Sequence, residues 1–142
     1  MGDPLSVTVS IVALLQLTAT ITGYLKDVKD GAEDRIKLRD EMRSTSHLLT
    51  LLQDRAEDAQ LQEKAVISWT SIKMLSVHSG PLDQLKETLE KLATNLLSHT
   101  SRLKNAIQAV KWPFDKASVM EILNSIERQK SLFQLALEND HM

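Results

Sequence analysis

The side chains best suited to chemistry in this chain are its histidines, serines and carboxylates, and their spacing argues against a catalytic centre. None of the histidines has a second histidine or a carboxylate at the spacing of a zinc-binding helix. The four are His47, His78, His99 and His141. No serine sits in the Gly-x-Ser-x-Gly turn that exposes a nucleophile, and no glycine-rich phosphate loop is present. The sequence therefore predicts a protein that is not an enzyme and that uses no cofactor and no metal.

The carboxylates are scattered along polar stretches, and many have a basic residue four positions further on. Glu33 precedes Lys37, and Glu87 precedes Lys91, at this spacing. Such pairs are typical of the solvent-exposed face of a helix. These residues therefore predict solvated helices and add no acid–base site.

One basic cluster differs from these pairs. Arg35, Arg39 and Arg43 are spaced four residues apart and share one helical face beside the apolar positions Leu38 and Met42. They are either a solvated flank whose aliphatic stems cover the core or a contact for anionic lipid headgroups or for the acids of a partner. The sequence leaves both interpretations open.

Length and composition limit the class of protein further. The chain has 142 residues, which corresponds to a single domain, and 42% of them are hydrophobic. With 17 basic and 19 acidic residues the net charge is -2, so no basic excess points to nucleic acid. The absence of cysteine excludes disulfides, a thiol nucleophile and thiolate metal sites. Few glycines and prolines favour helices over the many turns of a β-fold.

The elements that would position these side chains are separated by a few strong breaks. Asp3-Pro4 opens a first segment, Asp30-Gly31 a second, and Ser79-Gly80-Pro81 a fourth. Trp112-Pro113 is the last break, and Ser118 with Glu121 resembles a capping box for the final helix. The expected helical segments are 4–25, 32–60, a shorter one at 61–77, 81–111, and 118 onward.

Apolar residues recur in alternating steps of four and three along these segments, which gives each helix one buried face. The second segment carries Leu38, Met42, Leu49, Leu52, Ala56 and Ala59, with Thr45 at the polar position. The fourth carries Leu82, Leu85, Leu89, Leu92, Leu96, Leu103, Ala106 and Val110, with His99 interrupting. The last carries Val119, Leu123, Ile126, Phe133 and Leu137, with Lys130 as the exception. The pattern predicts an all-α, up-and-down bundle of about four long helices plus one short helix.

Several residues are expected to anchor this bundle. Leu49, Leu52, Leu89 and Leu92 lie on the apolar faces of two long helices. Trp112 and Phe114 flank Pro113, which disfavours helical conformation at the residue before it. We therefore expect these two aromatic side chains to fix the corner between the last two long helices.

The first segment is the most informative, because it has no charged side chain from Leu5 to Leu25 and is long enough to span a bilayer. A signal peptide is disfavoured, since no Lys or Arg precedes Lys26. The alternation from Val7 to Ile11 suggests a strand, but no second strand is predicted for it to pair with. Seven Ser, Thr and Gln residues dilute the apolar run and disfavour a permanent membrane span.

A helix with two apolar faces remains, and such a helix must be surrounded. Val7, Ile11, Leu14, Ile21 and Leu25 form one face, and Val9, Val12, Leu15 and Ala19 form the other. We expect a central buried helix, with a helix that is buried at rest and released on activation as the second possibility. In the released form Leu5 and Leu17 join these residues as the membrane-insertion and oligomerisation helix.

Three stretches of the chain resemble the HeLo-like N-terminal domain of fungal STAND proteins, which are NLR-like receptors. The first is Asp3-Pro4-Leu5-Ser6-Val7, followed by Ala13-Leu14-Leu15-Gln16-Leu17. The second is Lys111-Trp112-Pro113-Phe114. The third runs from Ile126-Glu127-Arg128-Gln129-Lys130-Ser131 into Leu135-Ala136-Leu137-Glu138-Asn139-Asp140. The resemblance covers essentially the whole chain.

This resemblance implies a helical effector domain, cytoplasmic at rest, followed in the receptor by nucleotide-binding and repeat domains. It is similar to the four-helix executioner of mammalian necroptosis and to coiled-coil domains of plant NLRs. In that class, oligomerised bundles expose an N-terminal helix that attacks the plasma membrane and kills the cell. The fungal setting is heterokaryon incompatibility and innate immunity. The implied partners are copies of the chain itself and membrane lipids, without nucleic acid.

Two hypotheses follow. In the first, the chain is a cell-death-inducing domain that oligomerises and permeabilises membranes through its N-terminal helix. In the second, it is a helical adaptor or oligomerisation module that recruits a protein partner and never contacts lipid.

Overall fold

The computed structural model describes residues 4–27, 32–61, 73–104 and 114–138. Within these ranges the chain is an all-α bundle with no strand, which confirms the predicted fold class. Its long helices are α1 (Pro4–Asp27), α2 (Ala32–Leu61), α4 (Pro81–Lys104) and α5 (Lys116–Glu138). Of the predicted short helix at 61–77, residues 73–75 are helical and 62–72 lie outside the described residues, as does Trp112.

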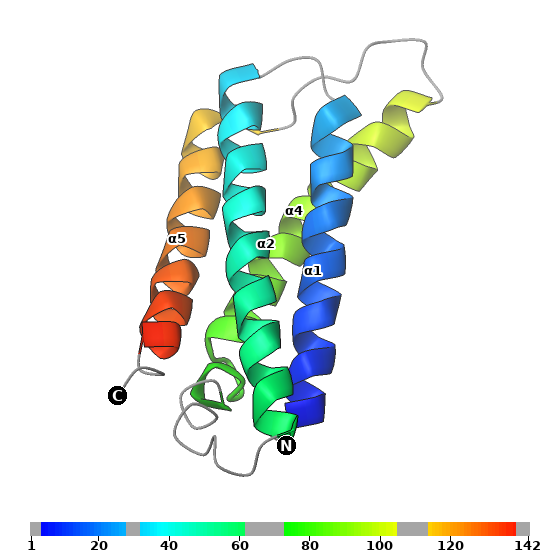
Figure 1. The fold of residues 1–142 in the computed structure, drawn as a ribbon. Coiled ribbons are helices and arrows are strands. Elements are labelled where there is room, and N and C mark those ends of the chain that lie inside the picture. The colour runs from blue at the N-terminus through cyan, green and yellow to red at the C-terminus, as the bar shows by residue number, and fades with distance from the viewer. Residues whose placement is uncertain (1–3, 28–31, 62–72, 105–113, 139–142) are drawn as a thin grey trace.

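The helices alternate in direction, but their order around the bundle does not follow their order in the chain (Figure 1). α1 packs against α2 and α4, and α5 packs against the same two helices from the other side. α2 and α4, which follow one another among the long helices, therefore occupy diagonal corners. As a consequence α1 runs parallel to its neighbour α4, and α2 runs parallel to α5.

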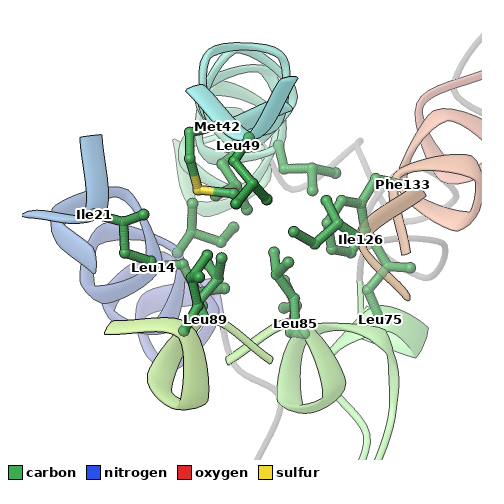
Figure 2. Close-up of a cluster of buried hydrophobic side chains, with 14 of the residues drawn as sticks. Leu14, Ile21, Met42, Leu49, Leu75, Leu85, Leu89, Ile126 and Phe133 are labelled. Carbon is green, nitrogen blue, oxygen red and sulfur yellow. The ribbon is translucent and has the colours of Figure 1, made fainter. Parts of the chain in front are cut away.

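The core runs along the axis of the bundle and receives large side chains from all four helices (Figure 2). The predicted anchors Leu49, Leu52, Leu89 and Leu92 are all at most 1% exposed, which confirms the apolar faces of α2 and α4. Leu75, from the short helical stretch, lies near Phe133 of α5. Phe114 is half-buried against this core, as expected for a corner anchor.

A tight turn fixes the start of α4. Ser79 adopts a φ of 59°, and its backbone N–H donates to Asp83 Oδ2 at 2.9 Å. The N–H of Gly80 donates to the carbonyl of Val77 at 2.8 Å. A Cβ added to Gly80 would lie 2.8 Å from that carbonyl oxygen, so the turn admits no larger residue without moving the backbone.

We expect Gly80→Ala to lower the free energy of unfolding by about 1–3 kcal/mol, because the methyl group overpacks the turn. Gly23 is the matched control, since it lies within α1, near the C-terminal end of the helix, with nothing within 4 Å of an added Cβ. Gly23→Ala should raise stability by about 0.5–1 kcal/mol through the better helix propensity of alanine. Urea denaturation followed by circular dichroism measures both changes. Equal effects of the two substitutions would contradict the steric argument.

The start of α5 differs from the sequence prediction. α5 begins at Lys116, so Ser118 lies inside the helix and the predicted capping box with Glu121 is wrong. The cap is Asp115, whose Oδ1 accepts a hydrogen bond from the backbone N–H of Ser118 at 2.7 Å. Its carbonyl accepts the first helical bond, from Val119 at 3.1 Å. Two hydrogen bonds with Ser118 hold the pKa of Asp115 below its usual value. The larger effect comes from the backbone N–H of Ser118, and the smaller one comes from its side chain.

This cap makes the start of α5 sensitive to acid. Because the folded state lowers the pKa of Asp115, the ionised carboxylate stabilises the fold above the pKa of the unfolded chain. That contribution is lost as the pH falls through the lower, folded pKa. We therefore expect Asp115→Asn to be less stable than the parent at pH 7, and the gap to close in acid. Urea denaturation across pH tests this, with Asp54→Asn, at an exposed site within α2, as the control.

Candidate functional site

α1 lies at a corner of the bundle, with only one of its two apolar faces covered. Its buried positions form a single stripe that faces α2 and α4. They are Val7, Ile11, Leu14, Thr18, Ile21 and Leu25. The expectation of a central buried helix is therefore wrong. A bundle of four helices around one core has no interior position, so each helix keeps a side open to solvent.

The open side of α1 carries no charge. Val9 of the second apolar face is 62% exposed, and Ala13, Gln16, Ala19 and Thr20 are exposed as well. The remaining predicted insertion residues are half-buried at its edges, and they are Val12, Leu15 and Leu17. Leu5 belongs to α1, but its side chain lies outside the described residues. The helix thus presents an uncharged, partly apolar surface to its surroundings.

Three of the four threonine hydroxyl groups of α1 form hydrogen bonds to carbonyl groups of the same helix. Thr18 donates to the carbonyl of Leu15 at 2.8 Å, and Thr22 donates to that of Thr18 at 2.8 Å. Thr20 donates to the carbonyl of Gln16 at 2.9 Å. A hydroxyl bonded within its own helix leaves no donor to be satisfied when water is removed. These threonines therefore dilute the apolar character of α1 less than the sequence suggested.

Length and composition also permit α1 to cross a bilayer. The stretch Val7–Lys26 has a mean hydropathy of 1.5, and 28% of its most apolar part is buried. It is the one helix in the described part of the chain that meets this criterion. Buried helices of soluble proteins meet it too, so length alone assigns no membrane role.

A shallow groove follows the boundary between α1 and α4. It consists of two adjoining hollows of about 250 and 310 Å³ that share Ala13, Leu14 and Lys86. The exposed Val9 lines one end of the groove, and Leu17 lines the other. The groove places part of the open side of α1 beside polar residues of α4.

The predicted arginine cluster lies on α2, and its first member contacts α1. Arg35 donates from one guanidinium nitrogen to the carbonyl of Leu25 at 3.3 Å, so it satisfies one of the last carbonyls of α1. Arg39 is half-buried, and Arg43 is exposed. Arg35 thus stabilises the C-terminal end of α1, while Arg43 is accessible to a binding partner.

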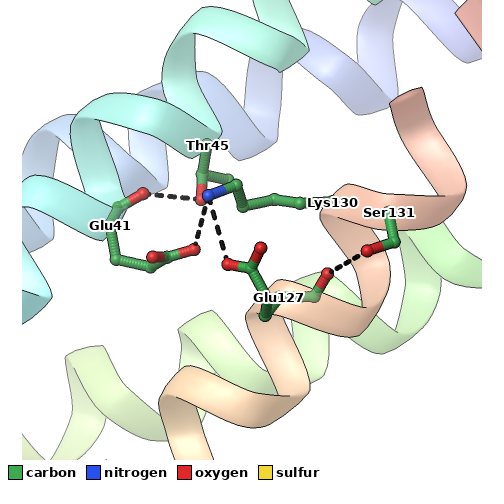
Figure 3. Close-up of polar contacts among 5 residues, drawn as sticks. All are labelled: Glu41, Thr45, Glu127, Lys130 and Ser131. Carbon is green, nitrogen blue, oxygen red and sulfur yellow. Dashed lines mark hydrogen bonds and ion pairs between the residues drawn. The ribbon is translucent and has the colours of Figure 1, made fainter.

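The structure adds a polar cluster that the sequence did not indicate, at the boundary of α2 and α5 (Figure 3). Lys130 of α5 is only 8% exposed, and its Nζ lies 2.9 Å from Glu41 Oε1 and 3.4 Å from Glu127 Oε2. The fully buried Thr45 lies beside them and donates to the carbonyl of Glu41 at 2.7 Å. The two polar interruptions of separate apolar stripes, Thr45 and Lys130, therefore meet at one place.

A groove of about 500 Å³ opens onto this cluster. Two lysines, three carboxylates, two apolar side chains and two small polar residues line it. They are Lys37, Asp40, Glu41, Ser44, Met120, Leu123, Asn124, Glu127 and Lys130. Met120 is 55% exposed, so the groove combines an apolar contact with a small excess of negative charge.

A second polar contact joins α4 to α5. Gln129 is 1% exposed, and its amide nitrogen donates to Gln84 Oε1 at 2.9 Å. Thr88 and Ser125 share a hydrogen bond of 3.0 Å one turn further on. Together with Lys130, Gln129 gives α5 a polar partner on each neighbouring helix. Such contacts fix the register in which α5 packs.

The described part of the chain contains no candidate metal centre. No group of three or more His, Asp or Glu side chains there could hold a metal ion. His47 and His78 are exposed on different parts of the bundle, and the side chains of His99 and His141 lie outside the described residues. Comparisons with protein-family models, curated proteins and solved structures found no match to this chain.

Proposed function

We propose that this chain is a cell-death-inducing effector domain that oligomerises and then permeabilises a membrane through α1. In this proposal the bundle is cytoplasmic at rest, as the N-terminal part of a fungal NLR-like receptor with nucleotide-binding and repeat domains. Clustering of the receptor brings copies together at the plasma membrane. The resemblance of three stretches to HeLo-like domains supports this assignment.

The proposal rests on the lack of charge in α1 and on the position of this helix in the bundle. The helix has no charge from Leu5 to Leu25, lies at a corner of the bundle and leaves one uncharged face open. In a bilayer, backbone groups must be satisfied internally, and a continuous helix does this. The hydroxyl groups of Thr18, Thr20 and Thr22 are bonded to carbonyls of α1 itself, so they add little to the cost of insertion.

Release of α1 from the bundle is energetically favourable only where the helix enters an apolar medium. Leaving the bundle exposes Val7, Ile11, Leu14, Ile21 and Leu25, each of which gains roughly 1.5–3 kcal/mol from burial. In water this cost keeps α1 on the bundle. In lipid the same side chains enter an apolar environment again, which offsets the loss.

The exposed groove between α1 and α4 supports a second candidate function. An adaptor that recruits a protein partner would bury the open face of α1, including Val9, without contacting lipid. The two functions differ in whether the open face of α1 must enter a membrane.

Gln16→Glu separates them. Gln16 is exposed near the middle of the uncharged stretch, so the substitution adds one charge to α1 and should leave the fold intact. On insertion scales a charge at the centre of a helix costs roughly 2.5–3.5 kcal/mol. We therefore expect dye leakage from liposomes to fall by at least about tenfold. Lowering the pH should restore leakage in part, because it neutralises the introduced carboxylate.

The matched control is Gln134→Glu, the same change at an exposed position of α5. It should leak like the parent, and both variants should melt at the parent's temperature by circular dichroism. A folded Gln16→Glu variant that permeabilises liposomes as well as the parent would overturn the membrane mechanism and favour the adaptor.

A further inference from the structure

The groove between α2 and α5 combines a small excess of acidic side chains with an exposed apolar side chain. Lys130 is engaged by Glu41 and Glu127, and Lys37 pairs with Glu33 at 3.6 Å. Asp40 and the outer, exposed part of Glu127 leave the rim of the groove negative. Met120 supplies an exposed apolar contact within the same groove.

The complementary surface lies on the other flank of the same turns of α2. Arg39 and Arg43 follow Arg35 at four-residue spacing along α2, and Arg35 contacts the end of α1, which has no charged side chain from Leu5 to Leu25. Arginine is well suited to such a contact, because its planar head pairs with carboxylates while its stem covers apolar surface. One flank of residues 37–44 is therefore basic, and the other borders an acidic groove.

We propose that the acidic α2–α5 groove of one copy receives the Arg39–Arg43 flank of a second copy, and this rests on the oligomerisation in the proposed function. The groove lies between α2 and α5, whereas Arg35, at the start of the basic flank, contacts α1 on the other side of α2, so one partner does not face both surfaces at once. The contact is therefore heterologous, and repeating it gives a ring or an open filament rather than a closed dimer.

The position of both surfaces sets the geometry of this assembly. They lie at the same level along α2, so successive copies stand side by side without a shift along the bundle axis. Where successive copies point the same way, the N-terminal ends of their α1 helices lie on one face of the assembly. That arrangement would present every α1 to the same membrane.

A charge exchange tests the contact. Arg43→Glu removes a cation from the basic flank, and Asn124→Lys puts a cation into the groove while leaving the pairs of Lys130 intact. We expect each single variant to weaken self-association by at least about tenfold, because like charges then face each other. The double variant should restore it, since the introduced charges attract across the contact. Sedimentation velocity over a concentration series at low salt measures the association directly, without a membrane.

The controls are Lys91→Glu and Asn95→Lys, which make comparable charge changes at exposed positions of α4. Neither should alter association. The proposal is overturned if the parent stays monomeric at every concentration, or if the double variant associates no better than the single ones. Loss of binding to anionic phosphatidylserine vesicles in Arg43→Glu without rescue in the double variant would assign the arginines to lipid headgroups instead. Leakage without self-association would refute this contact and the oligomerisation step, and would leave membrane permeabilisation by α1 standing.

Discussion

Replacing Leu49 or Leu89 by aspartate is expected to unfold the domain. Both side chains are 0% exposed and lie in the cluster that joins the four helices (Figure 2). Truncation of such a leucine to alanine already costs about 2–5 kcal/mol. An unpaired carboxylate in the same place adds the cost of removing its charge from water. The total is comparable to the roughly 5–15 kcal/mol that stabilise a typical domain.

Circular dichroism should show loss of helix and of the cooperative melt in both variants. Leu51→Asp is the control for Leu49→Asp, because Leu51 lies two residues further along α2 and is 38% exposed. That variant should keep the fold and lose little stability. A cooperative melt of Leu49→Asp near the parent's temperature would contradict the core described for this bundle.

Removing Glu41 is expected to be the second most damaging change. Lys130 is buried, and without the Glu41 carboxylate at 2.9 Å it retains only Glu127, whose side chain is 63% exposed. Breaking a buried ion pair from one side costs about 3–5 kcal/mol, because the remaining charge is left without compensation. We therefore expect Glu41→Ala to lower the free energy of unfolding by about that amount in urea denaturation.

Replacing both charged residues of the pair is expected to leave the free energy of unfolding unchanged or to raise it. The double variant Glu41→Leu with Lys130→Met places apolar side chains of similar size in the cluster, and such exchanges are often neutral or stabilising by about 1–4 kcal/mol. Lys37→Ala, which breaks an exposed pair with Glu33, should cost less than about 1 kcal/mol. A Glu41→Ala variant no less stable than Lys37→Ala would show that the buried pair is not needed.

The apolar faces of the helices could be predicted because each follows from local periodicity. Leu49 and Leu89 are buried as expected, and Thr45 and Lys130 were recognised as exceptions. Their common partner Glu41 could not be recognised, since it is one of many charged residues outside the apolar steps of α2. Which flank of α2 faces α5 depends on how the helices are arranged around the core, and no local pattern encodes that arrangement.

The position of α1 and the start of α5 show the same limit. One apolar face of α1 is buried as predicted, but the second face was expected to be covered as well, and its Val9 is 62% exposed. The number of helices that neighbour α1 depends on the whole bundle. At the start of α5, both Asp115 and Ser118 have residue types that favour a helix cap. The sequence alone does not rank them, and the structure shows that the backbone turns into the helix at Asp115.

The diagonal placement of α2 and α4 has a consequence for how the chain reaches its native state. α1 with α2, and α4 with α5, are antiparallel neighbours in sequence and in space, so each pair closes through local contacts. The contacts of α1 with α4 and of α2 with α5 join residues far apart in the chain. We expect two helical hairpins to form early and to dock in a later, slower step, because distant contacts carry the larger loop-closure entropy. The Glu41–Lys130 pair forms in that docking step, so it should govern the unfolding rate more than the rate of hairpin formation.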